Sequence, residues 1–504
     1  MRSLGLLVPA LLLSAGFARS PLVHGEGALS GGPSFQHDEP IVVETHHDDG
    51  STKERFVVDD NGRKDGAYER FRPDGSLEVR ASYRDDAPHG IWQEFDESDL
   101  RTVEGNFRHG TRDGFWRTFV GDVTTLEARY KNGDLHGDWR SSTPDGSHLV
   151  RGKYVRGELH GRWLEERPAT RWERTAKYVR GELDGKARIR VRGKTVSKRR
   201  WKKGVLIELD GRVPYPVPES ALRGEIEEAL ASEETDGAEP RSDEPDDALR
   251  RRALARLKAY RALCQLPWRD ITLVPEWNEL CRAAAEVLEA NGELSHTPPK
   301  PPVFDEERYR QGYEGANKSN IHFGPGGVVS SIDFYMDDSD AKNIDSVGHR
   351  RWCLNPAMGR TGFGRSGVWS AMWAMDASGN GVRGRKTVLY PPDGFVPADL
   401  FGPRYAWSVQ FLDGHEPSEG RVDVLVFELD DYYQARGSAL ELDWNARAEG
   451  DMGNSPCYVF RPVGIVCAPG SRYGMEIRLD GGDTPDFEYL VEFVAPIRGN
   501  GEGR

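Results

Sequence analysis

The chain has 504 residues, of which 37% are apolar and 30% are charged, and it carries 57 glycines, 31 prolines and a net charge of -14. At roughly 100–200 residues per domain, this length predicts about three domains. The composition is typical of a turn-rich modular protein; it excludes a protein with several membrane spans and disfavours one large α/β enzyme core.

The N-terminus has the features of a targeting segment. Leu4–Ala15 is an apolar run of twelve residues after a short basic start, and Gly16-Phe17-Ala18 offers small residues for cleavage. The run is too short for the roughly 20 residues of a transmembrane helix. We therefore expect a signal peptide over 1–18 and a secreted or cell-surface protein without a transmembrane segment; a buried N-terminal helix is the alternative. A polar, irregular leader is predicted over 19–60.

A His-Gly or Asp-Gly pair recurs about every 24 residues within 61–212. The repeated glycines are Gly66, Gly90, Gly114, Gly137, Gly161 and Gly185. A tryptophan stands two residues after four of them, and an aromatic residue stands seven residues before the later ones. This period predicts one β-hairpin per repeat, with the glycine at the turn and the aromatic residues packed against the next hairpin. Stacked neighbours then supply the core that one hairpin lacks.

The repeat unit, Tyr-x-x-Gly-x-x-His-Gly-x-Trp as in Tyr154–Trp163, resembles MORN-type repeats in a bacterial variant. The resemblance implies an elongated β-hairpin solenoid that binds or scaffolds and does not catalyse. One repeat position alternates between histidine and aspartate: His89, His136, His160, Asp65, Asp113 and Asp184. Histidines alone suggest a metal, but the alternation with aspartate favours a role in turn geometry.

Charge is segregated along the chain. Residues 151–204 carry 19 Lys or Arg against 6 Asp or Glu, a net of +13, whereas 219–247 carry 12 acids against two arginines, a net of -10. The basic segment predicts a surface for a cell-wall polymer, a lipid headgroup or an acidic glycan; the alternative is a solvated face partly neutralised by the acidic stretch. We expect no nucleic acid partner for an exported protein. The acidic stretch predicts a linker over 213–247.

The pattern then changes to helical spacing. Apolar stripes predict helices over 248–263 and 273–288, the second ending at an Asn-Gly signal. A further apolar segment over 328–336 and predicted strands over 359–364 and 368–375 complete an α-β-α order.

Three motifs in this region carry a second resemblance. They are Leu294-Ser295-His296, Ala316-Asn317-Lys318-Ser319-Asn320-Ile321, and Gly348-His349-Arg350-Arg351-Trp352-Cys353-Leu354-Asn355-Pro356 followed by Gly362-Phe363-Gly364. Together they resemble the CAP superfamily of cysteine-rich secretory, antigen 5 and pathogenesis-related proteins, in its bacterial subgroup. The resemblance implies an α-β-α sandwich over 248–385 whose cleft holds two histidines and two acids.

His296 and His349 match the two histidines of that family, while Glu314 and Asp333 are the candidate acids, with Asp337 as an alternative to Asp333. Two imidazoles beside carboxylates suit Zn²⁺ or a general base. A hydrolase also needs a nucleophile, and Ser295 is a neighbour of His296 only in sequence. Three interpretations stay open: a cleft that binds a ligand or metal, histidines that only support helix packing, and a secreted metal-dependent hydrolase.

Two further features of this half concern acids and thiols. Residues 337–340 lack the glycine and glutamate of an EF-hand loop, so they are interpreted as surface acids at a helix end or as partners of Arg350 and Arg351. The cysteines are Cys264, Cys281, Cys353, Cys457 and Cys467. In an exported chain, Cys457 with Cys467 is the candidate disulfide, Cys264 with Cys281 is a second option, and Cys353 is the expected free thiol.

Short alternating runs predict a β-sandwich over 386–498. The predicted fold class is therefore a β-hairpin repeat solenoid, then a CAP-like α-β-α sandwich, then a C-terminal β-sandwich. The predicted function is non-enzymatic binding or scaffolding, with an extracellular protein, a lipid or an anionic cell-surface polymer as partner.

Overall fold

The computed structural model describes residues 40–233, 246–412, 414–415, 421–448, 455–482 and 484–497. It divides into two compact units, unit 1 up to Glu158 and unit 2 from Leu159. The predicted signal peptide over 1–18 lies outside the described residues. Within the described part of the chain, no helix has both the length and the apolar character needed to cross a membrane.

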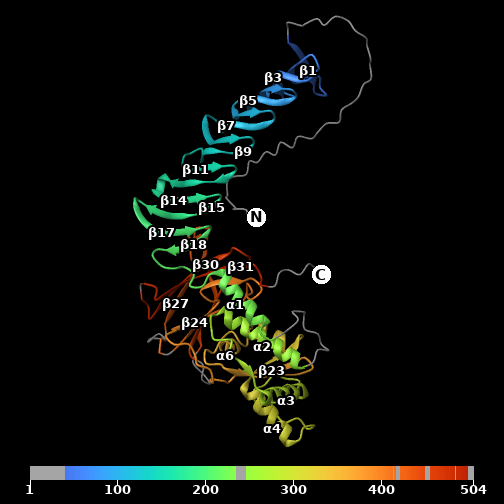
Figure 1. The fold of residues 1–504 in the computed structure, drawn as a ribbon, viewed down its shortest axis with the longest axis vertical. Helices are drawn as coiled ribbons and strands as arrows, with labels where there is room; N and C mark the ends of the chain where they lie inside the picture. The colour runs from blue at the N-terminus through green and yellow to red at the C-terminus, as the bar shows by residue number, and fades with distance from the viewer. Residues whose placement is uncertain are drawn as a thin grey trace, which may run out of the picture. The chain divides into compact units, whose positions relative to one another are not determined.

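Unit 1 consists of antiparallel strands that pair mainly with their neighbours in sequence (Figure 1). Its strands are β1 (Ile41–His46), β2 (Thr52–Val58), β3 (Lys64–Phe71), β4 (Leu77–Arg84), β5 (Ala87–Phe95), β6 (Arg101–Arg108), β7 (Thr111–Val120), β8 (Val123–Lys131), β9 (Asp134–Leu135), β10 (Gly137–Ser142) and β11 (Leu149–Val155). The predicted irregular leader over 19–60 is wrong for β1 and β2, because Phe56 of β2 stacks on Tyr68 of the first repeat.

The hairpin turns do not lie at the repeated glycines. The turns nearest to them are two-residue turns with both residues at positive φ, as at Asn132 (φ 51°) and Gly133 (φ 90°), the geometry whose twist matches that of paired strands. Longer turns join the strands at their other ends, as over 72–76 and 96–100. The repeated glycine lies four residues later, at the start of or inside a strand, as Gly137 does at the start of β10. The placement of the glycine at the turn is therefore wrong, because Asn-Gly and its equivalents already supply the two positive φ values.

Aromatic pairs connect neighbouring strands of each repeat. Trp92 meets Phe107 edge-on with ring centroids 5.4 Å apart, and Trp116 meets Tyr130 at 6.2 Å. Edge-to-face pairs at these separations contribute about 0.5–1.5 kcal/mol beyond their buried area. The aromatic positions of the repeat thus form the core of the array.

Unit 2 opens with further hairpins and then turns helical. Strand β12 (Glu158–Leu159) lies at the boundary of the units, and the hairpin strands of unit 2 are β13 (Gly161–Arg167), β14 (Trp172–Val179), β15 (Glu182–Leu183), β16 (Gly185–Val191), β17 (Lys194–Lys202) and β18 (Val205–Leu209), with a 3-10 turn, η1 (Pro168–Thr170). The helices are α1 (Glu219–Ala231), α2 (Asp246–Leu263), α3 (Pro275–Asn291), α4 (Glu306–Lys318), α5 (Gly327–Asp337) and α6 (Gly348–Cys353).

Short strands accompany these helices. They are β19 (Thr272–Leu273), β20 (Ser319–Phe323), β21 (Arg360–Thr361), β22 (Phe363–Ser366) and β23 (Trp369–Trp373). Strands β20, β23 and β22 form a three-stranded sheet, and β19 pairs with β21. Helix α3 packs on this sheet, where Trp277 stacks on Trp373 with ring centroids 4.9 Å apart.

The predicted fold class, with its CAP-like α-β-α sandwich, is wrong. The structure is mainly β, with 44% strand and 19% helix, and the large antiparallel array of N-terminal hairpins dominates it. The helical stripes at 248–263 and 273–288 do form α2 and α3, but the sheet beside them has strands of only four or five residues. The hairpin repeats, with their alternating aromatic residues, bury one face by antiparallel pairing, so strand outweighs helix in the chain as a whole.

The predicted linker over 213–247 contains helix α1. Leu222, Ile226 and Ala229, spaced three or four residues apart, are buried, and α1 packs on α2. The acidic composition concealed this narrow apolar stripe, which is enough to hold a helix against a neighbour.

The C-terminal part of unit 2 forms two four-stranded sheets. One has the order β24 (Thr387–Tyr390), β26 (Trp407–Phe411), β29 (Cys457–Pro462) and β28 (Leu442–Ala448). The other has the order β25 (Gly394–Pro397), β31 (Phe487–Val494), β30 (Arg472–Leu479) and β27 (Val422–Leu429). Trp407, Tyr473 and Phe493 are buried among these strands.

All five cysteines are free thiols, so neither the Cys457–Cys467 nor the Cys264–Cys281 disulfide is formed. Cys457 points into a buried cluster with Val347 and Ala406, whereas Cys467 lies beyond the end of β29 and is half-buried. Sequence spacing alone did not show that the side chain of Cys457 faces the core.

Candidate functional site

The predicted residue His349 lies at the first turn of α6, where it meets a buried acid. Helix α5 ends at Asp337, and the next residue, Asp338, adopts a left-handed conformation with φ 45°. Val347, immediately before α6, also has a positive φ, 41°, which is strained for a β-branched residue and is held by its burial. These two bends bring the Asp338 carboxylate to 2.8 Å from Nδ1 of His349.

Asp338 is an almost completely buried carboxylate. Its side chain is 1% exposed and that of His349 is 19% exposed, and the backbone N–H of Arg350 also donates to it at 3.2 Å. Burial by itself would lower the pKa of His349, but the charge and hydrogen bond of Asp338 outweigh burial and raise it. The carboxylate therefore favours the charged form of the imidazole, whose side chain is partly exposed.

Two more histidines surround this pair. His296 lies between α3 and α4, and its Nδ1 is 2.8 Å from the carbonyl oxygen of Ala316. Burial lowers the pKa of His296, and the charge of His349 lowers it further. His322 of β20 stacks on Phe334 with ring centroids 4.5 Å apart; burial, with a smaller effect of His349, lowers its pKa to about 4.

A tyrosine contacts two rings of the histidine cluster, which we define as His296, His322, His349 and Asp338. The Tyr335 ring lies 5.3 Å from the His349 ring and 6.3 Å from the His322 ring. Among the described residues, His322 Nε2 is a buried atom that has no hydrogen-bond partner. The cluster thus combines one imidazole whose pKa is raised with two whose pKa values are lowered.

The two predicted acids lie elsewhere. Asp333 accepts hydrogen bonds from Nε of Arg256 and from the hydroxyl of Tyr260, both at 2.7 Å. Glu314 is exposed on α4 near Arg310. The acid that serves the site, Asp338, belongs to the acidic run that the sequence assigned to the surface, and the signal that could have found it is its spacing of eleven residues before His349.

His322 was also missed. It directly follows the motif that ends at Ile321, and in the structure that motif is the end of α4 followed by β20. The amide of Asn320 donates to the carbonyl oxygen of His349 at 3.0 Å. The motif therefore fixes the backbone of His349.

The cluster does not fit the predicted zinc site. The Nδ1 atoms of His296 and His349 bond to Ala316 and Asp338, which still leaves their Nε2 atoms as possible ligands. Structural and catalytic zinc sites, however, need at least three protein ligands. The described residues contain no group of three or more His, Cys, Asp or Glu side chains placed to hold a metal ion.

No nucleophile is paired with these rings in the described part of the chain. The hydroxyl oxygen of Ser295 accepts from the backbone N–H of Thr297. The buried thiol of Cys353 accepts from the amide of Asn320 at 3.6 Å, and burial raises its pKa. A thiol with a raised pKa is a poor nucleophile.

The alternating His/Asp position of the repeats forms a junction between hairpins. Nδ1 of His89 accepts from the backbone N–H of His109 at 3.4 Å, and Asp113 accepts from that of Asn132 at 3.2 Å. Further along, His136 accepts from the backbone N–H of Arg156, and Asp184 accepts from that of Lys203. Histidine and aspartate interchange here because each offers an acceptor to the next turn.

The junction predicts a pH effect. Loss of hydration, with the nearby cations Arg84, His109 and Arg108, lowers the pKa of His89. A histidine with a lowered pKa stabilises the fold above its ordinary pKa, and this contribution is lost as the pH falls through the lowered value. His89→Asp keeps a hydrogen-bond acceptor in acid. The melting temperature of the variant minus that of the wild type should therefore increase as the pH is lowered from 7.5 to 5.

Thermal unfolding of the full chain at a series of pH values measures this difference. His89→Asn is the control. Its amide oxygen is also an acceptor and does not titrate, but unlike aspartate it carries no charge. A constant difference between wild type and His89→Asp over this range contradicts the junction role.

Comparison with known proteins gives no identification. No protein-family model matches the chain, and no curated protein matches it significantly.

Proposed function

We propose that this is a secreted or cell-surface binding and scaffolding protein, not an enzyme, with MORN-type repeats as an interaction surface and the histidine cluster as a small-ligand site. The CAP resemblance enters this proposal only through His296 and His349. The observation that carries it is the 2.8 Å pairing of His349 with buried Asp338, because the carboxylate raises the pKa of the ring and favours the imidazolium, which donates a hydrogen bond to a ligand.

The cluster favours an anionic or hydrogen-bond-accepting group as ligand. His349 offers its Nε2–H with a positive charge, and charge-assisted hydrogen bonds are about twice as strong as neutral ones. The rings of His296 and His322, whose pKa values are lowered, add polar nitrogen atoms without adding a second positive charge. A His–Asp pair is also two thirds of a catalytic triad, so hydrolysis is the alternative that the experiments must exclude.

Asp338→Asn is expected to lower the pKa of His349, because the amide keeps the shape of the carboxylate but removes its charge. The His349–Asp338 pair stabilises the fold below the ordinary histidine pKa, and this stability is lost as the pH rises through the raised value. Two-dimensional NMR of the histidine ring resonances follows the titration directly. Asp333→Asn is the matched control, since Asp333 binds Arg256 and Tyr260 and should leave the titration unchanged.

The functional test compares the full-length wild type with His349→Ala. Titration with acetate and with inorganic phosphate should shift the His349 ring resonances in the wild type, and equal background rates of ester and peptide hydrolysis are expected for both proteins. Hydrolysis by the wild type clearly above that of His349→Ala contradicts the binding role and supports a hydrolase.

A further inference from the structure

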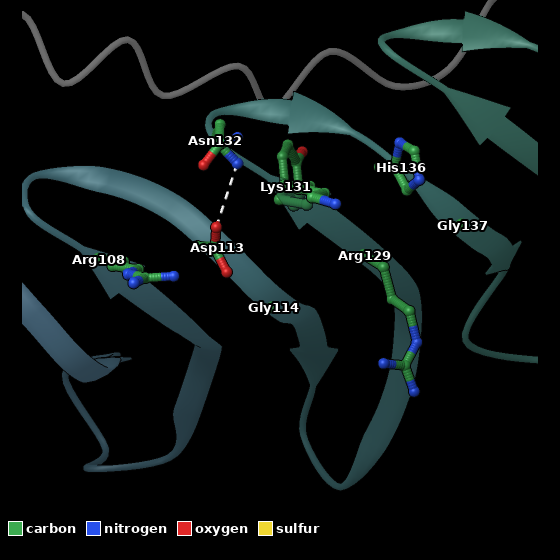
Figure 2. Close-up of a pocket in the computed structure, with 9 residues that line it drawn as sticks. Arg108, Asp113, Gly114, Arg129, Lys131, Asn132, His136 and Gly137 are labelled. Carbon is green, nitrogen blue, oxygen red and sulfur yellow. Dashed lines mark hydrogen bonds between the residues drawn. The ribbon is translucent and has the colours of Figure 1, made fainter.

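A hollow of about 570 Å³ opens on the face of unit 1. Side chains from β6, β7, β8 and β10 and from the turns beside them surround it (Figure 2). We call it the cationic hollow, and its lining is Arg108, Asp113, Gly114, Arg129, Tyr130, Lys131, Asn132, His136 and Gly137. It is open to solvent and is not an enclosed cavity.

The repeat itself makes the hollow. Gly137 has a φ of 112°, and a Cβ at this position would lie 3.3 Å from Cδ of Arg129. At Gly114, a Cβ would lie 3.1 Å from the side-chain nitrogen of Asn106. The missing side chains leave a notch on successive hairpins, and the stem of Arg129 lies beside it.

The charge in the hollow is not neutralised. Arg108, Arg129 and Lys131 are exposed, and the described residues place no carboxylate within ion-pair distance of any of the three. The single acid of the lining, Asp113, already accepts from the backbone N–H of Asn132 (Figure 2). Farther along β8, by contrast, Glu127 pairs with both Arg117 and Arg140.

The spacing of these cations indicates the kind of ligand. Arg108 and Lys131 each follow the repeated aromatic residue, Phe107 or Tyr130, and one strand lies between them. Two strand spacings place such equivalent positions about 10 Å apart. Two cations at this separation, comparable to the length of a disaccharide, suit a linear polymer with one anionic group per repeat better than a single small anion.

The remaining lining favours a sugar over a membrane surface. Tyr130 supplies a half-buried aromatic ring, and Asn132 and His136 supply polar groups that suit hydroxyls. The lining contains no aliphatic side chain that would enter a lipid bilayer. We infer that the cationic hollow binds an acidic polysaccharide through Arg108, Arg129 and Lys131. This inference rests on the proposed role of the repeats as an interaction surface, and it does not involve the histidine cluster.

The test measures binding of the full chain to immobilised heparin, a sulfated polysaccharide, and to hyaluronan, a carboxylated one. The variant Arg108→Gln/Arg129→Gln/Lys131→Gln should weaken binding about tenfold or more, as expected for the loss of charge-assisted hydrogen bonds. The control Lys186→Gln/Arg188→Gln/Lys198→Gln removes the same charge from exposed positions of β16 and β17 and should change binding less than about twofold. Binding to one polymer alone identifies the anionic group.

Four results overturn the inference. Three are no binding of either polymer, equal loss in the two triple variants, and stronger binding of phosphatidylserine vesicles than of both polysaccharides. The fourth is loss confined to the control variant, which moves the site to the basic segment 151–204 and leaves the proposed function standing. The His349 titration, measured on the same proteins, reports separately on the ligand site of the proposed function.

Discussion

Arg350→Met should destabilise unit 2 by about 3 kcal/mol or more, because the arginine is buried and its donors serve several carbonyl groups. The side chain is 1% exposed. Its Nε donates to the carbonyl oxygen of Met336 at 2.8 Å, and Nη1 donates to that of Ala406 at 2.8 Å and to the hydroxyl of Ser408 at 3.1 Å. Methionine fills similar space but leaves these acceptors without partners.

Urea unfolding followed by tryptophan fluorescence measures the loss, and NMR of the His349 ring shows whether the site changes with it. Arg350 connects the end of α5 to the start of β26, so the histidine cluster should broaden or shift in the variant. Arg310→Met, on the exposed face of α4 with a partner at Glu307, should leave stability unchanged. An Arg350→Met variant within 1 kcal/mol of the wild type would contradict this role.

Gly364→Ala is the second change with a large expected effect. A Cβ on Gly364 would lie 2.0 Å from the backbone nitrogen of Arg282 and 2.3 Å from the carbonyl carbon of Cys281. These are backbone atoms of α3, so the helix has to move away from β22. We expect a loss of about 3 kcal/mol or more, at the upper end of overpacking effects.

The matched control is Gly224→Ala in α1. A Cβ there meets no atom within 4 Å, and replacing an exposed helical glycine by alanine should stabilise by about 0.5–1 kcal/mol. The same chemical change thus has opposite signs at the two positions. Chemical denaturation of both variants measures this, and a Gly364→Ala protein as stable as wild type would disprove the close contact between helix and strand.

Features that depend on residues close together in the sequence were predictable. The aromatic spacing of the repeat predicted that aromatic residues pack between neighbouring hairpins, and the apolar stripes around Leu257 and Ala284 predicted α2 and α3. The glycines of Gly362-Phe363-Gly364 were noticed as a motif, but their reason, the close approach of α3, depends on a neighbour 80 residues away in sequence.

The candidate site was predictable only in part. His296 and His349 lie where their charges interact, but Asp338 looked like any surface acid because its burial depends on the left-handed bend after α5. Asp333 lies on the face of α5 that packs against α2, so Arg256 and Tyr260 of α2 donate hydrogen bonds to it. The backbone conformation decides which carboxylate lies beside His349, and residue spacing does not predict that conformation.

The pairing of each strand of unit 1 with its neighbours in sequence has a mechanical consequence. A pull on the two ends of such a meander acts on the bonds between neighbouring strands and on the junctions at His89 and His136, which bond one hairpin to the next. Each repeat of 24 residues, once released, adds about 80 Å of extended chain at roughly 3.3–3.6 Å per residue. We therefore expect unit 1 to lengthen under tension in steps of about one repeat.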